Sequence, residues 1–440
     1  MQFPIPPLSL CYVAALTPPR WTVRIHDENL SAANSLSDWT PDLVGITTLT
    51  PTAPRAYALA EQYRARGATV VLGGIHPTVV PDEAMAHADS VVVGEAEPIW
   101  SQLIADFEQG QLQPSYRGPL TDLDRLPTPR RDLLSKRYFV ETLITSKGCT
   151  NACDFCAIWR VYGRRYRPRP IDAVVDEVAQ LPSSKFIFFA DDNLALLRHR
   201  LSELCSLLVA RKGRLRYAIQ ASLGIADDPE LLHWLKRSGC AFIFIGLESL
   251  NDEALSAIGK PDLLRATTAG YLERIARIHA NGIAVFGSFI VGLDGDTTAV
   301  FDQIREFVLS AGIDCALINI LSPTPGTLLW DRLRNQDRLL YLDFPADYAL
   351  YVQDNVCFRP EGMTPEALQE GTRRLLADLN RPAVAFRRAR ATWRHTHDPL
   401  TTLVALGWNW RTFRSLSIFP PRDVRELSSQ DIGPSRRGTV

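Results

Sequence analysis

The chain has 440 residues, enough for two or three domains, and its formal net charge is −1 at pH 7. A charge this close to zero gives no bulk attraction to nucleic acid, so we expect no nucleic-acid partner. No apolar run reaches the roughly 18 residues of a membrane-spanning helix, and no basic-then-apolar signal segment opens the chain.

Residues 1–115 alternate short apolar runs with helical patterns, which is typical of a doubly wound, Rossmann-like α/β domain with a parallel sheet. The expected strands are Trp21–Ile25, Leu43–Ile46, Val70–Leu72 and Val91–Val93, and the expected helices are Arg55–Arg66 and Pro98–Phe107. Ligands on such sheets bind beyond the carboxyl ends of the strands, where this chain carries glycine pairs and hydroxyl groups. A plain flavodoxin-like scaffold would show the same glycines.

Residues 116–140 are rich in proline and charge and read as a linker between two domains. The next segment, residues 141–330, contains six apolar strand patterns: Glu141–Ser146, Phe186–Ala190, Tyr217–Ala221, Phe242–Gly246, Val285–Val291 and Ala316–Leu321. The helical patterns between them are Ile171–Gln180, Leu194–Arg211, Pro229–Arg237 and Leu264–Ala280. Six repeats predict a partial (β/α)6 barrel, with active-site residues at the carboxyl ends of the strands.

Three cysteines, Cys149, Cys153 and Cys156, follow the first of these strands. Thiolates at this spacing can ligate three irons of a four-iron cluster and leave the fourth open for a ligand. Gly148 suits the tight loop that this requires. A zinc site or three buried thiols are the alternatives, but no second Cys or His pair follows at zinc spacing. The other five cysteines stand alone in apolar contexts, which fits reduced thiols in the cytoplasm.

The three cysteines, with the aromatic Phe155 before the last of them, resemble the motif of the radical S-adenosylmethionine (SAM) superfamily. The resemblance implies a [4Fe-4S] cluster whose open iron chelates the amino and carboxylate groups of SAM. It also implies reductive cleavage of SAM to a 5′-deoxyadenosyl radical, with electrons from a donor such as flavodoxin or ferredoxin.

On this resemblance, polar residues at the other strand ends would bind SAM. Asp191, Asp192 and Asn193 could receive hydrogen bonds from its ammonium group, although an N-cap role is an equal alternative. The remaining candidates are Gln220 and Ser222 for a carboxylate or ribose, Gly246 and Glu248 for the ribose hydroxyls, and Gly287, Ile290, Gly292, Pro323 and Pro325 for the adenine. The basic-aromatic stretch 159–167 could hold an anionic group or simply face solvent.

The N-terminal segment resembles the cobalamin-binding domain that precedes some radical SAM cores. The resemblance rests on four phrases: Pro6–Leu10, Pro41–Ile46, Leu72–Thr78 and Val93–Glu97. It implies a pocket for the nucleotide tail of cobalamin, lined by Thr48, Thr50, Gly73, Gly74, Gly94 and Glu95. The cobalt-ligating Asp-x-His-x-x-Gly motif is absent, and we expect His76 to serve a loop or capping role. The family's first strand is also absent, so either the start lies upstream or the sheet lacks one strand.

Residues 331–428 read as a mainly helical extension, and residues 429–440 read as a disordered tail. The expected helices are Trp330–Leu340, Pro365–Leu379 and the basic Pro382–Arg394, and the bulky aromatics are Phe386, Trp393, Trp408, Trp410 and Phe413. The extension resembles that of cobalamin-dependent radical SAM proteins such as hopanoid methylases, where it would cover the open side of the barrel and shape the substrate pocket. We expect the aromatics to pack against the core, with peripheral membrane contact as the alternative.

Together these resemblances imply a cobalamin-dependent radical SAM methyltransferase that acts on an unactivated carbon of a small molecule, lipid or natural-product intermediate. A related cyclase or oxidase without methyl transfer and a non-enzymatic cobalamin or redox sensor are the alternatives. A methylthiotransferase is disfavoured because no further cysteine set could hold a second cluster.

Overall fold

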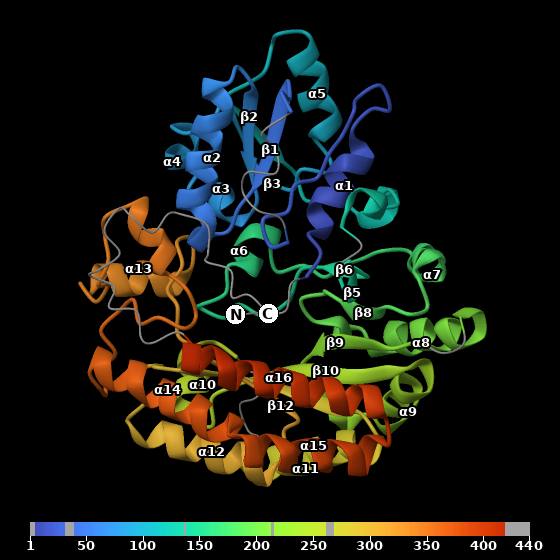
Figure 1. Cartoon of the computed structure of the whole chain (residues 1–440), viewed down its shortest axis with the longest axis vertical. Coiled ribbons are helices and arrows are strands. Elements are labelled where there is room, and N and C mark those ends of the chain that lie inside the picture. Colours follow the sequence, from blue (N-terminus) through green and yellow to red (C-terminus); the bar gives the residue numbers. More distant parts are fainter. Residues whose placement is uncertain (1–4, 31–38, 136–137, 213–214, 261–267, 419–440) are drawn as a thin grey trace.

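The computed structural model describes residues 5–30, 39–135, 138–212, 215–260 and 268–418. An N-terminal α/β domain lies at one end of the molecule, a six-stranded sheet lies in the middle, and helices of the C-terminal region lie across its other end (Figure 1). Among the described residues, no helix is long and apolar enough to cross a membrane.

The N-terminal domain is built on a parallel sheet with the strand order β1-β2-β3-β4. Its strands are β1 (Leu43–Thr47), β2 (Thr69–Gly73), β3 (Ser90–Gly94) and β4 (Ser115–Gly118). Its helices are α1 (Leu8–Leu16), α2 (Ala53–Ala65), α3 (Ile75–Val79), α4 (Pro81–Met85) and α5 (Trp100–Glu108). Alternate residues of β2 and β3 face α2 on one side and α1 with α5 on the other, as the two-residue period of a strand requires.

The structure corrects the sequence prediction for this domain in two places. Trp21–Ile25 is not a strand. Instead, the Trp21 ring packs on Phe107 of α5 with centroids 5.7 Å apart, and its Nε1 donates to Glu108 Oε1 at 2.9 Å. Strand β4 was not predicted, and it extends the sheet into the stretch that we interpreted as linker.

The central sheet is parallel in the order β12-β11-β10-β9-β8-β5, which confirms the predicted six-stranded barrel segment. Its strands are β5 (Val140–Leu143), β8 (Phe186–Phe189), β9 (Tyr217–Ala221), β10 (Cys240–Glu248), β11 (Ala284–Val291) and β12 (Cys315–Ile320). The main helices are α7 (Ile171–Gln180), α8 (Arg198–Lys212), α9 (Pro229–Ser238), α11 (Thr268–Ala280) and α12 (Ala299–Ser310). Residues 264–267 of the predicted fourth helix lie outside the described residues.

Short elements surround the cysteine loop and complete the connections. An antiparallel pair, β6 (Ser146–Lys147) and β7 (Arg167–Pro168), brackets the loop. The short helices are α6 (Ile158–Tyr162) and α10 (Asp252–Ala257). The 3-10 turns are η1 (Thr50–Thr52), η2 (Leu123–Arg125), η3 (Arg131–Leu133), η4 (Leu194–Leu196), η5 (Leu223–Asp227) and η6 (Ala346–Leu350).

The C-terminal region is helical, as predicted, and packs on the barrel. Its helices are α13 (Leu328–Asn335), α14 (Pro365–Asn380), α15 (Pro382–Thr396) and α16 (Pro399–Ile418). Helix α16 packs against the amino-terminal halves of the strands, where Ala405 meets Phe242 and Cys315 in one apolar cluster. It therefore covers the end of the barrel that lies away from the carboxyl ends of the strands.

The aromatic residues of this region divide into two groups. Trp408 stacks edge-on against Phe286 with centroids 4.7 Å apart, so the prediction of core packing is correct for Trp408. It is wrong for Phe386, Trp393 and Trp410, which are 59%, 44% and 42% exposed. The side chain of Phe413 and the predicted tail 429–440 lie outside the described residues.

Candidate functional site

The cysteine loop begins at a glycine that no other residue could replace without strain. Gly148 has φ +89°, and a Cβ there would lie 2.1 Å from the carbonyl oxygen of Arg165. Its N–H donates to Asp192 Oδ2 at 2.8 Å, and the N–H of Cys156 donates to Cys153 O at 3.1 Å. The positive φ of Gly148 and these two hydrogen bonds therefore fix the backbone conformation of the loop.

The three cysteines of the loop differ in exposure and influence one another. Cys153 is buried, whereas Cys149 and Cys156 are half-buried. Burial raises the pKa of Cys153 to about 12, and the neighbouring thiolate charges of Cys156 and Cys149 add to this rise. Thiols that repel one another as anions are the ligands that a positively charged iron centre would stabilise.

The spacing of the sulfur atoms argues against a single zinc ion. Among the described residues, one trio of His, Cys, Asp or Glu ligand atoms lies mutually within 4.8 Å, and it does not include these cysteines. Thiolates on one tetrahedral zinc would lie roughly 3.8 Å apart, given Zn–S bonds of about 2.3 Å. Ligands to three different irons of a cube stand further apart, so the donor set fits a [4Fe-4S] cluster.

Asp154, inside the loop, connects it to two other elements. Its carboxylate pairs with Arg332 of α13 at 2.8 Å, its carbonyl accepts from the N–H of Leu329 at 3.0 Å, and its N–H donates to Ile258 O at 3.1 Å. The loop is thereby held on both sides by chain that lies more than 100 residues away in sequence.

Asp191 holds the strand that leads into the loop. Its fully buried carboxylate accepts from the N–H of Thr145 at 3.0 Å, from Thr145 Oγ1 at 2.8 Å and from Ser146 Oγ. Burial raises the pKa of Asp191 to about 6, against the effect of these donors. The structure therefore places Asp191 behind the loop and gives it no helix-capping bond, while its neighbour Asp192 fixes Gly148.

The predicted SAM contacts at β8 and β9 lie together. Asn193 Nδ2 donates to Ser222 Oγ at 2.8 Å, and Gln220 is half-buried on β9. Asn193 Oδ1 is buried and accepts no hydrogen bond from any described residue. An unsatisfied buried acceptor is costly, so this oxygen suits a ligand donor such as an ammonium group.

Glu248 has a protein partner that the sequence did not reveal. It adopts φ +59°, and its Oε1 accepts from Lys260 Nζ at 2.5 Å, while the same nitrogen donates to Gly246 O at 2.7 Å. A non-glycine residue held at positive φ marks a constrained position of the kind that clusters at binding sites. The predicted role in ribose binding stays a prediction, because Lys260 also explains the buried charge.

The residues predicted to contact adenine also pack against neighbouring elements, and their role in adenine binding stays a prediction. A Cβ at Gly287 would lie 3.3 Å from Ile313 and Leu247, and a Cβ at Gly292 would lie 2.6 Å from Leu368 of α14. Ile290 is buried in the core. The turn that contains Pro323 and Pro325 ends at Gly326, which touches Val79 of α3, so this turn contacts the N-terminal domain. Phe155 packs on the main core.

A cavity of about 240 Å³ lies where the N-terminal sheet meets the segments on either side of the cysteine loop. Four of the six residues predicted to bind the cobalamin tail line it: Gly73, Gly74, Gly94 and Glu95. From the central part of the chain come Ile144, Lys147 and Tyr162. The cavity is smaller than typical small-molecule pockets of roughly 300–1,000 Å³. It therefore fits one arm of a larger cofactor, and the glycines leave room for that arm.

Ionic contacts cross the boundary beside this cavity. Lys147 Nζ lies 2.6 Å from Glu97 Oε1 and 3.3 Å from Glu95 Oε1. Arg167 donates two hydrogen bonds to the carboxylate of Glu95. Lys147 and Glu97 were not among the predicted site residues. Their positions in the sequence could have identified them. Lys147 stands two residues before the first cysteine, and Glu97 is the last residue of the segment Val93–Glu97, on which the cobalamin resemblance partly rests.

Thr48, Thr50 and His76 are buried, and the His76 ring packs edge-on against Tyr348 of η6 with centroids 4.7 Å apart. Both threonines are buried and do not line the cavity. The Nδ1 of His76 lies 3.2 Å from Thr50 Oγ1, and its Nε2 lies 3.0 Å from Tyr57 Oη. Both ring nitrogens of His76 are therefore occupied by protein groups, in agreement with the structural role expected for it.

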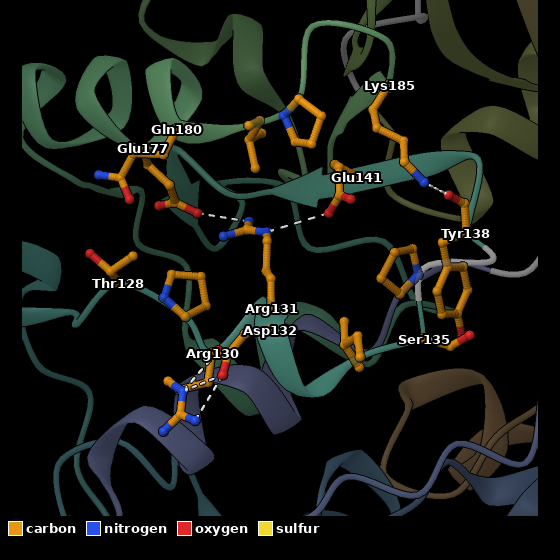
Figure 2. Close-up of a pocket in the computed structure, with 15 residues that line it drawn as sticks. Thr128, Arg130, Arg131, Asp132, Ser135, Tyr138, Glu141, Glu177, Gln180 and Lys185 are labelled. Carbon is orange, nitrogen blue, oxygen red and sulfur yellow. Dashed lines mark hydrogen bonds and ion pairs between the residues drawn. The ribbon is translucent and has the colours of Figure 1, made fainter.

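A second cavity of about 700 Å³ lies at the amino end of β5, between the linker and α7 (Figure 2). Arg131 points into it between Glu177 at 2.7 Å and Glu141 at 3.6 Å. None of its lining residues is a predicted site residue, and its central charges are already paired.

Comparisons with known proteins agree with this geometry. Residues 143–308 match the model of the radical SAM superfamily, and residues 1–104 match that of the B12 binding domain. The chain is 30% identical over 398 residues to the bacteriochlorophyllide d C-12(1)-methyltransferase of Chlorobaculum tepidum, which covers 87% of this chain and 84% of that protein. It is 30% identical over 352 residues to the hopanoid C-2 methylase of Rhodopseudomonas palustris, with 77% and 66% covered.

A solved structure shares the whole fold. The radical SAM methyltransferase TsrM of Kitasatospora setae, solved with cobalamin and a [4Fe-4S] cluster, superposes with a TM-score of 0.67 at 17% identity, covering 94% of this chain and 97% of that one. The fold and the three-cysteine loop define a radical SAM enzyme with an N-terminal B12 domain. This chain belongs to the radical SAM superfamily, among the B12-binding radical SAM proteins that include methyltransferases and hopanoid methylases.

Proposed function

We propose that this protein transfers a methyl group to an unactivated carbon of a small-molecule, lipid or natural-product intermediate. The observation that carries the proposal is the cavity between the N-terminal glycine turns and the segments that flank the cysteine loop, which contribute Ile144, Lys147 and Tyr162. Two relatives that this chain covers over 84% and 81% of their length are named as methyltransferases acting at carbon positions of bacteriochlorophyllide d. A shared cavity supports a reaction in which both cofactors face one substrate.

The cofactor-binding residues follow from the site. Cys149, Cys153 and Cys156 would hold the [4Fe-4S] cluster, and Asn193 with its neighbours on β9 would hold SAM. Gly73, Gly74, Gly94 and Glu95 would hold the tail of cobalamin. We propose residues 1–115 as the cobalamin domain, 116–140 as the linker, 141–330 as the radical SAM core and 331–428 as the C-terminal extension, whose helix α16 packs at the amino ends of the barrel strands.

When bound, the cluster and SAM would supply a hydrogen-abstracting radical, and cobalamin would supply the methyl group. The protein itself would position the cofactors and the substrate and exclude water from the reacting groups. Gly148 and Asp192 set the loop, and the buried pairs of Glu95 with Arg167 and Lys147 close the boundary between the two cofactor sites. A carbon radical attacks whatever is near, so the substrate must be held close to both groups and away from water.

The test uses anaerobically reconstituted protein with a chemical reductant or a flavodoxin as electron donor, and SAM with a deuterated methyl group. A chlorophyllide-type tetrapyrrole and a hopanoid triterpene serve as candidate substrates. Methyl transfer predicts S-adenosylhomocysteine, 5′-deoxyadenosine and a product that carries the deuterated methyl group.

A relative that catalyses a different reaction indicates which result of this experiment would argue against methyl transfer. The chain is 25% identical over 379 residues to the anaerobic magnesium-protoporphyrin IX monomethyl ester cyclase of Cereibacter sphaeroides. Consumption of a substrate with 5′-deoxyadenosine but no labelled product would favour ring closure or oxidation. Intact SAM under strong reductant would favour a cobalamin or redox sensor.

A further inference from the structure

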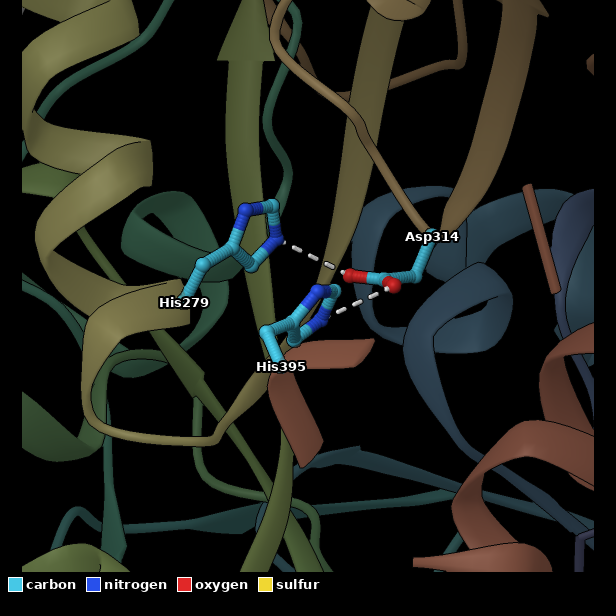
Figure 3. Close-up of side chains that lie close together, drawn as sticks. All are labelled: His279, Asp314 and His395. Atoms are coloured by element: carbon cyan, nitrogen blue, oxygen red, sulfur yellow. Dashed lines mark hydrogen bonds and ion pairs between the residues drawn. The ribbon is translucent and has the colours of Figure 1, made fainter. Parts of the chain in front are cut away.

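Two histidines and one aspartate meet at the amino end of β12, far in sequence from the cysteine loop (Figure 3). His279 comes from the last turn of α11, Asp314 directly precedes β12, and His395 comes from the last turn of α15. Their ligand atoms lie mutually within 4.8 Å. No other such trio of His, Cys, Asp or Glu exists among the described residues.

The distances are those of ligands that share one ion. Asp314 Oδ2 lies 3.1 Å from His279 Nε2, and Asp314 Oδ1 lies 3.2 Å from His395 Nε2. Two ligands on one tetrahedral zinc stand about 3.3 Å apart, given bonds of about 2.0–2.1 Å. The two imidazole rings are stacked, with centroids 4.1 Å apart, so both Nε2 atoms point at the same carboxylate.

One nitrogen of the trio lacks a hydrogen bond. His395 Nε2 is enclosed, and although it lies 3.2 Å from Asp314 Oδ1 it makes no hydrogen bond with any described residue. The side chain of Asp314 is completely buried, while those of His279 and His395 are 14% and 16% exposed. Parts of both histidine side chains therefore reach solvent, whereas His395 Nε2 itself is enclosed.

Hydrogen bonds from the surrounding protein fix the carboxylate from behind. Thr392 Oγ1 donates to Oδ1 of Asp314 at 2.5 Å, and the N–H of Val285 donates to Oδ2 at 2.7 Å. Each oxygen thus keeps a lone pair for the histidine side. Outer partners that orient a ligating carboxylate in this way are a regular feature of metal sites.

We propose that His279, Asp314 and His395 form a binding site for a divalent transition-metal ion, for which zinc is the probe. Two imidazoles with one carboxylate select such an ion over magnesium or calcium, which prefer all-oxygen sites. Because the three residues come from α11, the residue before β12 and α15, the ion would link the C-terminal helix α15 to the barrel. The site lies at the amino end of the strands, so its role is structural.

The site coincides with the place where the C-terminal helices already hold the barrel. Arg388 of α15 donates to the carbonyls of Ile313 and Asp314 at 3.0 and 3.2 Å, and Asn409 of α16 donates to Asp314 O at 3.0 Å. The backbone carbonyl of Asp314 thus already binds α15 and α16, and an ion on its side chain would add a further link at the same position.

The experiment titrates Zn²⁺ into the full chain after the cluster has been reconstituted, so that the loop thiols are occupied. Calorimetry gives the stoichiometry, and zinc K-edge X-ray absorption gives the ligand types. We expect one zinc per chain with only nitrogen and oxygen ligands, including imidazole. The affinity should fall at least about 100-fold in His279→Ala/His395→Ala and remain unchanged in His233→Ala, whose histidine is exposed on α9.

Zinc on sulfur ligands only, no binding at micromolar zinc, or equal binding by wild type and the double variant would each overturn the proposal. The absorption spectrum of the wild type is decisive even if the double variant does not fold. His279→Gln provides a milder variant that keeps a hydrogen-bonding side chain, and it should also bind zinc more weakly.

Discussion

Glu95 and Arg167 form a two-point ion pair across the boundary between the N-terminal domain and the radical SAM core. Arg167 Nη2 donates to Glu95 Oε1 at 2.6 Å, and Nη1 donates to Oε2 at 2.9 Å. Both side chains are buried. Burial alone would raise the pKa of Glu95, but Arg167 and Lys147 outweigh it and hold that pKa below its ordinary value. The carboxylate is therefore charged at neutral pH, directly beside the shared cavity.

The first prediction concerns Glu95→Gln. Removing one charge of a buried pair leaves Arg167 without its counter-charge and Lys147 with Glu97 alone, which costs roughly 3 kcal/mol. The melting temperature of the anaerobic holoenzyme should fall by about 3 °C, measured by calorimetry. Cobalamin affinity, measured by equilibrium dialysis, should fall with it because Glu95 lines the cavity.

The matched control is Glu108→Gln, which breaks the exposed pair of Glu108 with Arg20 at the surface of the same domain. Solvent-exposed pairs contribute little, so no measurable change is expected. Equal losses in the two variants would show that burial of the Glu95–Arg167 pair has no special role.

The second prediction concerns Asp191→Asn. The buried carboxylate accepts hydrogen bonds from the N–H and the hydroxyl of Thr145 and from the hydroxyl of Ser146, and the N–H lies within reach of both carboxylate oxygens. In the variant one of these oxygens becomes an amide nitrogen, which cannot accept. The strand leading to the cysteine loop should loosen, and the protein should retain less than about half of its iron after gel filtration, since an unsatisfied buried donor costs about 1–3 kcal/mol.

Iron content separates this positioning role from direct SAM binding. If Asp191 contacted the SAM ammonium, Asp191→Asn would keep its iron and weaken SAM binding alone. Asp176→Asn, which alters an exposed aspartate on α7, serves as the control and should match wild type in both measurements.

Local patterns were sufficient to predict most of the fold and the glycine that opens the cysteine loop. Apolar runs such as Phe186–Phe189 became buried strands because their period and length leave few other arrangements. Gly148 was correctly interpreted because its requirement is local: its positive φ and its close approach to Arg165 follow from the tight loop itself.

Contacts between distant residues could not be predicted in this way. The hydrogen bonds of Asp191 to Thr145 span 46 residues, and the pair of Glu95 with Arg167 spans 72. Trp21 shows the converse error, since its segment has a strand pattern but packs on α5 without pairing to the sheet. A pattern states what a segment can form, whereas tertiary partners decide what it does form.

The third prediction concerns Cys153→Ala. The cluster needs all three thiolates, so this variant should lose most of its iron and its absorption near 400 nm after reconstitution, and should no longer cleave SAM. Cys205→Ala, which alters a buried thiol elsewhere in the core, should retain both properties. Normal iron content in Cys153→Ala would mean that other residues complete the cluster.

The last prediction concerns pH and His76, whose ring is completely buried. Burial lowers the pKa of His76 below its ordinary 6.5, and Glu83 offsets this only in part. Just below pH 6.5, His76 is therefore protonated in the unfolded chain but still largely neutral in the folded chain. The stabilising contribution of His76 is complete above that pH and is lost as the pH falls. Wild type should lose more stability between pH 7 and pH 5.5 than His76→Gln does, measured as the difference between their urea-unfolding curves.

The control is His233→Gln, which alters an exposed histidine and should follow wild type throughout. An equal loss of stability with falling pH in wild type and His76→Gln would contradict the assignment of a neutral, buried imidazole.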